Sequence, residues 1–274
     1  MILLDGKKVS SEIISDIKNK IINLNNKIGF AIIWIGNDTA SSIYVKNKIK
    51  KCEDVGIKVD LFHLEENVTE EFVLNLIEDL NNRTDIQGIL LQSPIPKHID
   101  INKCFDKIKS EKDIDGFSYI SCGNLFLGKP SFISCTPKGI IRLLEYYKID
   151  LKGKNVCIIN RSNIVGKPLF HLLIERDATV TMCHSKTKNI SSFTKNSDIV
   201  ISAVGKPNFI TKEMIKENAI VIDVGISRVN GKVVGDVNFD EVSEKCSYIT
   251  PVPGGVGPMT IAMVLENILE TIKE

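Results

Sequence analysis

The stretch at residues 156–170 has the sequence VCIINRSNIVGKPLF. It begins with a β-branched run typical of a buried strand, passes through a polar turn and enters the start of a helix. Dinucleotide-binding proteins place their phosphate loop at such a junction, usually with the sequence G-x-G-x-x-G. Here Asn160 and Ser162 stand in the first two glycine positions, and Gly166, the only glycine of the stretch, lies one residue beyond the third. The question is whether this turn still binds a nucleotide.

The turn keeps features that suit a phosphate. A helix N-terminus offers unpaired N–H groups and the positive end of the helix dipole, so phosphate can bind with fewer glycines if the turn is wider. Gly166 permits close helix–strand packing, and Pro168 suits a first helical turn. Asparagine is the non-glycine residue that best tolerates positive φ. We therefore expect Asn160 to keep the path of the loop and its free N–H groups.

The following strand indicates which dinucleotide is favoured. NAD sites usually end this strand with an acidic residue that binds the ribose 2′-hydroxyl, but here it ends in His184, Ser185 and Lys186. With Arg161 on the neighbouring loop, this set of side chains favours the 2′-phosphate of NADP. The alternative is an ordinary strand–turn–helix that happens to be basic.

Apolar strand-like runs alternate with segments of helical period along the whole chain. The candidate strands are 30–36, 58–64, 88–94, 155–160, 178–184, 198–205 and 219–225. Helix starts are indicated at Ser10–Glu12, Thr69–Glu71 and Thr136–Pro137. This order predicts an α/β protein with parallel sheets flanked by helices and ligands at the carboxyl ends of the strands. A second series of strands begins after residues 136–150, which favours two domains.

Composition limits the classes of partner. The chain has 274 residues, of which 43% are apolar, and 35 basic residues nearly balance 34 acidic ones, so no overall field favours nucleic acid or an anionic membrane. No apolar run approaches the roughly 18 residues that span a bilayer. Seven cysteines without a C-x-x-C pair suit reduced thiols. We expect a cytoplasmic protein.

A lysine and a glutamine stand out in the first half. Segment 40–57 is expected to form a helix ending at Gly56, with Tyr44 and Lys48 on one face beside its apolar stripe. The lysine is then half sheltered, either as a surface residue with its stem along apolar surface or as a base near neutral pH. Gln92 ends a strand, where its amide can orient a ligand.

Three further loops carry candidate residues, each with a structural alternative. The acidic turn 111–116 contains Asp113 and Asp115, and such turns are often only solvated structure. Segments 202–207 and 221–226 end strands in glycine, where backbone can approach a flat cofactor ring. Segment 249–260 is rich in proline and glycine, and composition alone favours a connector.

Eight motifs together closely resemble the bifunctional methylenetetrahydrofolate dehydrogenase/methenyltetrahydrofolate cyclohydrolase family. They are YVKNK (44–48), LLQSPIP (90–96), EKDIDG (111–116), CTPKG (135–139), RSNIVGKP (161–168), CHSKT (183–187), VVGDV (233–237) and TPVPGGVGPMT (250–260). The resemblance covers nearly the whole chain. It implies oxidation of 5,10-methylenetetrahydrofolate by NADP to the methenyl form, followed by hydrolysis to 10-formyltetrahydrofolate.

The resemblance also implies roles for residues. Lys48 is the catalytic lysine, Gln92 orients it, Tyr44 lies against the aminobenzoate of the folate and Asp115 holds the pterin. Substrate is further expected at Pro253, Gly254 and Gly255. The expected NADP-binding residues are Asn160, Arg161, Ser162, Ile164, Gly166, His184, Ser185, Lys186, Ala203, Gly205, Gly225 and Ile226. No metal is required.

By the same resemblance, residues 1–137 with 258–274 form a folate-binding catalytic domain, residues 138–257 form a Rossmann-type NADP-binding domain, and the protein is a homodimer. Two departures from the family stand out: Ser93 replaces a usual leucine, and Asn160 replaces the glycine that commonly precedes Arg-Ser. The rival hypotheses are an enzyme with one of the two activities and a non-catalytic NADPH-binding module.

Overall fold

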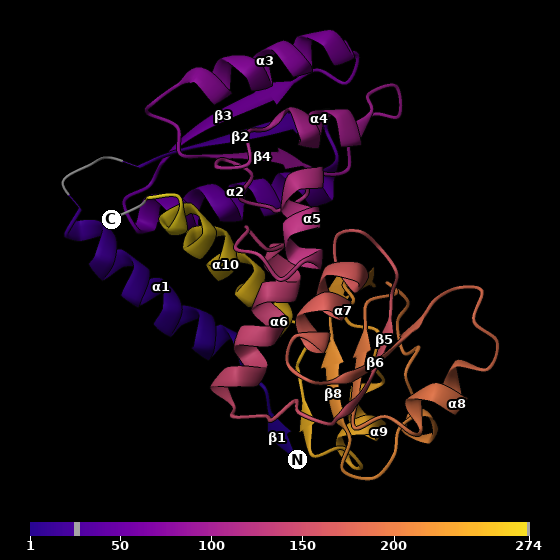
Figure 1. The fold of residues 1–274 in the computed structure, drawn as a ribbon. Coiled ribbons are helices and arrows are strands. Elements are labelled where there is room, and N and C mark those ends of the chain that lie inside the picture. The colour runs from indigo at the N-terminus through magenta and orange to yellow at the C-terminus, as the bar shows by residue number, and fades with distance from the viewer. Residues whose placement is uncertain (25–27, 273–274) are drawn as a thin grey trace. The chain divides into compact units, whose positions relative to one another are not determined.

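The computed structural model describes residues 1–24 and 28–272, which divide into two compact units (Figure 1). Unit 1 comprises Met1–Ser11 and Cys135–Met263, and unit 2 comprises Glu12–Ser134 and Val264–Glu274. The divisions fall inside two helices, α1 (Gly6–Ile22) and α10 (Val256–Glu270). Within the described residues, no helix combines the length and the apolar character that crossing a bilayer requires.

Unit 1 is built on a six-stranded, fully parallel sheet in the order β1-β11-β8-β7-β5-β6. Its strands are β1 (Ile2–Leu3), β5 (Asn155–Ile159), β6 (Thr179–Cys183), β7 (Ile199–Ser202), β8 (Ile220–Asp223) and β11 (Tyr248–Ile249). The chain runs from β5 to β6 on one side and then returns to β7 on the other side of β5. This reversal makes the space beyond β5 and β7 the topological switch point, where ligands of open α/β sheets bind.

Helices cover both faces of this sheet. On one face, α7 (Gly166–Ile174) packs on β5 and β6 and against α6 (Cys135–Tyr146). On the other face, α8 (Ile190–Thr194), the 3-10 helix η1 (Lys212–Met214) and α9 (Phe239–Ser243) contribute to an apolar cluster with strand residues such as Cys157, Val200 and Val221. The predicted Rossmann-type architecture is confirmed.

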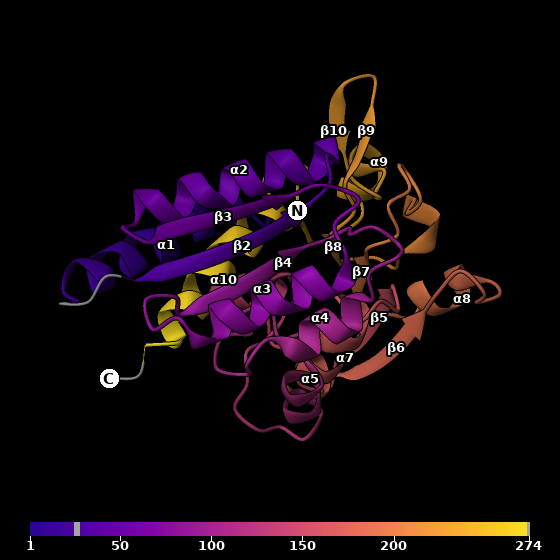
Figure 2. The same ribbon diagram turned by 90° about the horizontal axis from the view of Figure 1, so that it is seen from above.

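A small antiparallel hairpin stands apart from the main sheet of unit 1. Its strands are β9 (Ser227–Val229) and β10 (Lys232–Val234), and Asn230 and Gly231 at its turn both have positive φ. Figure 2 shows the hairpin projecting beside α9. No expectation from the sequence covered it.

Unit 2 contains a three-stranded parallel sheet in the order β3-β2-β4. The strands are β2 (Gly29–Ile35), β3 (Lys58–Leu64) and β4 (Gly88–Gln92). On one face, Ala31, Ile33 and Leu91 form a core with α3 (Glu70–Asn82) and α4 (Ile101–Lys107). Helix α2 (Thr39–Asp54) lies on the opposite face (Figure 1). Because side chains alternate along a strand, Gln92 belongs to the α2 face.

In unit 2, the C-terminal helix α10 is hydrogen-bonded to the loops around Ile114 and Ile133. Asn267 of α10 is fully buried, and its Nδ2 donates to the carbonyl oxygens of Ile114 at 2.6 Å and Ile133 at 2.9 Å. Helix α5 (Tyr119–Phe126) follows the acidic turn that contains Ile114. The C-terminal helix therefore holds the acidic turn in place.

Helix starts differ in how well the sequence predicted them. Thr69 caps α3 as expected, accepting from the Phe72 N–H at 3.2 Å. Helix α1 begins at Gly6, so the expected cap at Ser10 is wrong. The Ser10 hydroxyl instead donates to the Lys7 carbonyl at 3.1 Å, inside the helix. Asp5 caps this helix through its carboxylate, which accepts from the Lys8 N–H at 2.9 Å.

The sole tryptophan lies on the α2 face of the sheet in unit 2. Trp34 pairs with Gln92 on one side and His63 on the other, and its ring stacks on His63 with centroids 3.9 Å apart. Trp34 is 9% exposed, and among the described residues its indole N–H is the buried polar side-chain atom without a hydrogen-bond partner.

Candidate active site

Lys48 and Gln92 meet in unit 2. Lys48 lies in the middle of α2, Gln92 is the last residue of β4, and both side chains are half-buried. Lys48 Nζ donates to Gln92 Oε1 at 3.1 Å, and Gln92 Nε2 donates to the Ser93 carbonyl at 2.7 Å. Since its NH₂ group is engaged with Ser93, the amide presents its oxygen to Lys48. The structure thus brings together two residues that lie far apart in the sequence and that the family resemblance pairs.

The start of α2 is tied to the same strand end. The Asp38 carboxylate accepts from the Ser41 N–H at 2.7 Å and from the Ser41 hydroxyl at 2.8 Å. The Ser41 hydroxyl also lies 3.4 Å from the Ser93 carbonyl oxygen. Because Ser93 acts here through its backbone, its replacement of a leucine leaves these contacts available.

Along this face of α2, the side chains become more buried from Tyr44 to Cys52. Tyr44, one turn before Lys48, is 40% exposed, so its ring has a surface available for stacking. Cys52, one turn after Lys48, is buried, and burial raises the pKa of its thiol to about 12. The thiol is therefore inert packing, and the polar chemistry of this face is carried by Lys48.

The two aspartates of the acidic turn differ in burial. Asp113 is 1% exposed and accepts from the Phe117 N–H, the Ser118 N–H and the Ser121 hydroxyl at 2.7–3.2 Å. Burial raises the pKa of its carboxyl. Asp113 is thus committed to fixing the turn at the start of α5. Asp115 is half-buried two residues later.

In unit 1, the expected cofactor residues follow the carboxyl ends of neighbouring parallel strands. Asn160–Ser162 follow β5, His184–Lys186 follow β6, Ala203–Gly205 follow β7, and Gly225–Ile226 follow β8. Parallel strands end at one edge of a sheet, so these loops share that edge.

The loop between β5 and α7 corrects one expectation about Asn160. Its backbone is not in the left-handed region, so the tolerance of asparagine for positive φ is not used here. Its Oδ1 accepts from the Ser162 N–H at 2.7 Å and the Gly166 N–H at 3.1 Å. These two groups are therefore engaged, and the expectation that the loop keeps its N–H groups free is wrong for them. Asparagine at a strand end forms this local turn with ordinary φ.

Three polar residues near this edge are open to solvent. Arg161, Ser185 and Lys186 are exposed, and Ile164 is 42% exposed. The turn after β6 is closed by the Thr187 hydroxyl, which accepts from the His184 N–H at 2.9 Å, while the Lys186 N–H donates to His184 Nδ1 at 3.2 Å. No carboxylate follows β6 within this turn. The arrangement suits a phosphate better than a free ribose hydroxyl.

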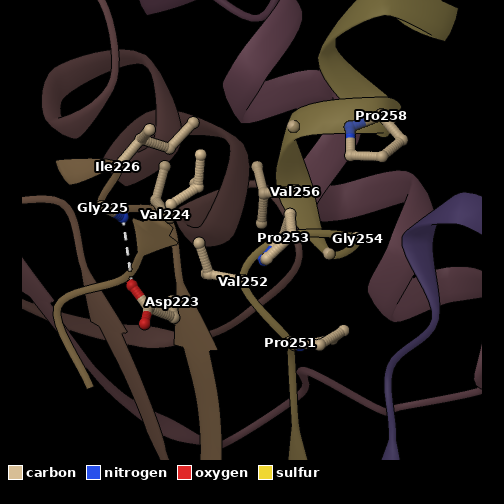
Figure 3. Close-up of a pocket in the computed structure, with 13 residues that line it drawn as sticks. Asp223, Val224, Gly225, Ile226, Pro251, Val252, Pro253, Gly254, Val256 and Pro258 are labelled. Carbon is tan, nitrogen blue, oxygen red and sulfur yellow. Dashed lines mark hydrogen bonds between the residues drawn. The ribbon is translucent and has the colours of Figure 1, made fainter. Parts of the chain in front are cut away.

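A cavity of about 130 Å³ opens where β8 and β11 end (Figure 3). Most of its walls are glycine, proline and valine. The lining residues are Asp223, Val224, Gly225, Ile226, Val233, Pro251, Val252, Pro253, Gly254, Gly255, Val256, Gly257 and Pro258. The proline-rich segment 249–260 is thus a cavity wall as well as a connector, and Gly225, Ile226 and Pro253–Gly255 lie together there.

Two buried aspartates shape this edge and were missed in the sequence. Asp236 is fully buried and accepts from the Ser202 hydroxyl and the N–H groups of Val204 and Lys206 at 2.7–2.9 Å. Asp223 is 3% exposed and accepts from the N–H groups of Gly225, Asp236 and Val237 at 2.9–3.1 Å.

Burial raises the pKa of Asp223 to about 6, and the nearby Asp236 carboxylate adds to this effect. A Cβ on Gly225 would lie 2.0 Å from Asp236 Oδ1, and one on Gly235 would lie 1.9 Å from Asp223 Oδ2. The Asp236 carboxylate therefore packs on Gly225, which lies two residues after Asp223. The Asp223 carboxylate packs on Gly235, which directly precedes Asp236. The available signal was an aspartate within two residues of a glycine in both VIDVG and VVGDV.

Comparison with known proteins identifies relatives along the whole chain. The model of the tetrahydrofolate dehydrogenase/cyclohydrolase catalytic domain matches residues 4–115, and that of the NAD(P)-binding domain matches residues 134–274. The bifunctional protein FolD of Clostridium novyi is 51% identical over 276 residues, covering 99% of each chain.

Solved structures agree. Bifunctional FolD from Campylobacter jejuni has a TM-score of 0.97 at 48% identity, covering 99% of this chain and 98% of that one. FolD from Trypanosoma brucei, solved with NADP and an inhibitor, has a TM-score of 0.94 at 35% identity, covering 99% and 97%. The chain therefore belongs to the tetrahydrofolate dehydrogenase/cyclohydrolase family.

Proposed function

We propose that Lys48 and Gln92 carry the hydrolytic step, and the carboxyl edge of the unit 1 sheet the redox step, of a bifunctional folate enzyme. As a member of its family the chain is an NADP-dependent methylenetetrahydrofolate dehydrogenase and a methenyltetrahydrofolate cyclohydrolase. Full-length similarity to bifunctional relatives favours both activities over one alone and over a non-catalytic module.

The single observation that carries the hydrolytic assignment is the hydrogen bond of 3.1 Å between Lys48 and Gln92. Hydrolysis of a cationic methenyl carbon requires water to lose a proton as it attacks. A half-buried amine can accept that proton, provided that it is held in place. Gln92 fixes the direction of the amine because its own NH₂ group is bound to Ser93. Lys48 is thus the base and Gln92 its positioning partner.

Two further residues are proposed to bind the folate. Tyr44 lies on the same helical face as Lys48, and its exposed ring suits stacking on the aminobenzoate. Asp115 is proposed to hold the pterin, whose ring N–H and amino groups are donors. We also assign residues 1–137 with 258–274 to folate binding and residues 138–257 to NADP binding.

The NADP site is proposed to follow the carboxyl edge of unit 1. Bound NADP supplies a nicotinamide ring that accepts hydride from the methylene carbon. Arg161, Ser185 and Lys186 are proposed to bind the 2′-phosphate, and Ser162, Ile164, Gly166 and His184 to border the dinucleotide. The glycines at 205 and 225, with Ala203 and Ile226, allow a flat ring to approach the backbone. Pro253–Gly255 would face the substrate from the cavity wall.

We further propose a cytoplasmic homodimer that acts on tetrahydrofolate derivatives and binds neither nucleic acid nor membrane. The near balance of 35 basic and 34 acidic residues supports the last part. Sedimentation velocity of the purified protein would measure the oligomeric state, and a monomer at micromolar concentration would contradict the dimer.

One experiment tests both activities. Purified protein is mixed with methylenetetrahydrofolate and either NADP or NAD, and the absorbance of the methenyl product is followed as it forms and decays. We expect formation with NADP, much slower formation with NAD, and decay faster than in a matched reaction without protein. Formation without accelerated decay would indicate a dehydrogenase alone, and decay of added methenyltetrahydrofolate without formation would indicate a cyclohydrolase alone.

A further inference from the structure

Asn160 makes a hydrogen bond across the sheet. Its Nδ2 donates to the carbonyl oxygen of Ala203 at 2.6 Å. Asn160 directly follows β5 and Ala203 directly follows β7, the two strands that flank the topological switch point. The last backbone bond between these strand ends runs from the Ala203 N–H to the Ile159 carbonyl at 3.3 Å. The asparagine side chain therefore adds one more link beyond the backbone ladder.

The other end of the same amide holds the loop. Oδ1 accepts from the N–H groups of Ser162 and Gly166, the first at the turn and the second at the start of α7. The Val165 N–H donates to the Ser162 hydroxyl at 3.1 Å. One side chain thus connects the end of β5, the loop, the start of α7 and the end of β7.

We propose that Asn160 is a positioning residue for the dinucleotide, which fixes the β5–α7 loop against β7 before the cofactor binds. It acts through the loop, in place of the direct contact with NADP that the family resemblance implies for Asn160. Where a glycine stands at this position, the Ala203 carbonyl and the N–H groups of Ser162 and Gly166 lack this partner. The inference rests on the proposed NADP site of unit 1.

The physical effect is pre-organisation. A loop whose path is already fixed loses less conformational freedom when the dinucleotide binds, so more of the contact energy appears as affinity. The start of α7 is tightly packed against the end of β5, since a Cβ on Gly166 would lie 2.3 Å from the Asn160 carbonyl oxygen. Loss of the amide is therefore expected to weaken cofactor binding and to leave hydrolysis of methenyltetrahydrofolate, which needs no dinucleotide, unchanged.

Two variants separate the cross-strand link from the local turn. Asn160→Ala removes all three hydrogen bonds. Asn160→Ser keeps an acceptor for the Ser162 N–H, but its short side chain cannot reach the Ala203 carbonyl. Asn155→Ala, at the exposed amino end of the same strand, is the matched control.

The first measurement is the Kd of NADP by isothermal titration calorimetry, with cyclohydrolase activity as the measure of a correct fold. We expect both Asn160 variants to bind NADP about tenfold more weakly, or ~1.4 kcal/mol. The KM for NADP should rise in parallel while kcat changes little, and Asn155→Ala should match the wild type. If Asn160→Ser or Asn160→Ala binds within about twofold of the wild type, the inference is wrong.

Amide hydrogen exchange of the free protein gives a second test that needs no turnover and no folded variant. The N–H groups of Ser162 and Gly166 should exchange slowly in the wild type, because each donates to Asn160 Oδ1. Exchange of both at the rate of unprotected loop amides would overturn the inference. Absence of either enzymatic activity from the wild type would count against the proposed function alone, since the Kd and the exchange rates are measured without folate.

Discussion

Lys48 and Gln92 lie 44 positions apart in the sequence and share a hydrogen bond of 3.1 Å. The bond joins the middle of a helix to the last residue of a strand, two elements whose ends also meet at the Ser93 carbonyl. Because helix and strand are held at both places, the amine has little freedom of direction. A base requires such a fixed direction when it must accept a proton from a water molecule that attacks one particular carbon.

Replacing Lys48 by methionine should separate the two chemistries. Methionine keeps much of the packing of the stem but removes the base, so cyclohydrolase kcat should fall roughly 10²–10⁴-fold. Hydride transfer needs no proton acceptor and should survive in part. Stopped-flow assays of each step check this, with Lys46→Met, on an exposed part of the same helix, as the matched control. Retained cyclohydrolase activity would eliminate Lys48 as the base.

Replacing Gln92 by glutamate tests the positioning role through pH. A carboxylate at hydrogen-bond distance favours the charged ammonium of Lys48, so more hydroxide is needed to free the amine. The rising limb of the cyclohydrolase pH profile should therefore move to higher pH, while Gln92→Ala should lower the rate without that displacement. An unchanged profile in Gln92→Glu would show that Gln92 does not influence the base.

Arg161→Ala should change the choice of dinucleotide. A charge-assisted contact to phosphate contributes on the order of 1.5–3 kcal/mol, so NADP should bind roughly ten- to a hundredfold more weakly while NAD is barely affected. Titration calorimetry with both dinucleotides measures this. The control is Arg176→Ala, which removes the same charge from the far end of α7, where Arg176 pairs with Glu145. Equal weakening of both cofactors would place Arg161 at the pyrophosphate.

Asp223 should make stability depend on pH. Burial raises its pKa from 3.8 to about 6 in the folded protein, so the folded state binds the proton more tightly than the unfolded chain does. Its stabilising contribution is then fully present below pH ~4 and is lost as the pH rises through about 6. The loss should be on the order of 2–3 kcal/mol.

Urea unfolding between pH 4 and pH 7 tests this with Asp223→Asn, which cannot ionise. The free energy of unfolding of the wild type, relative to the variant, should fall by that amount across the range. Asp240→Asn, at an exposed position, should keep the wild-type slope. If wild type and Asp223→Asn change in parallel, Asp223 titrates alike in the folded and unfolded states.

Two glycine-to-alanine changes should have opposite signs. Gly225→Ala forces a methyl group to within 2.0 Å of Asp236 Oδ1, and relief of that clash should cost about 1–3 kcal/mol of stability. It should also impair the dehydrogenase, because Gly225 lines the cavity. Gly123→Ala in α5 meets no atom within 4 Å and should stabilise by roughly 0.5–1 kcal/mol. Thermal unfolding of both variants measures the change in midpoint temperature. Two changes of the same sign would contradict the prediction.

The sequence predicted the strands well where they are long and buried on both faces. Segments such as 30–36 and 155–160 contain unbroken apolar runs rich in β-branched residues. Such runs are typical of parallel strands that helices cover on both faces. Strands β1 and β11 have two residues each, too few for any pattern, and exist because the sheet edge offers them partners.

Side-chain contacts were harder to predict than elements. The cap of α3 follows from residues next to each other, whereas the link from Asn160 to Ala203 spans 43 positions and depends on strand order. Propensity indicated only that Asn160 tolerates a left-handed backbone. In the structure the backbone has ordinary φ, and the side chain makes three hydrogen bonds. Asp223 and Asp236 escaped notice because an aspartate close to a glycine also occurs in solvated turns. Tertiary context decided these three.

The lone tryptophan gives this protein a built-in optical probe of one unit. Trp34 is buried in the sheet of unit 2, stacked on His63 and paired in register with Gln92, and unit 1 contains no tryptophan. Its fluorescence during denaturation therefore follows the loss of unit 2 alone, whereas far-ultraviolet circular dichroism follows the helices and strands of both units. If the two signals share a midpoint, the chain unfolds in one step; if they separate, the difference measures the stability of each unit.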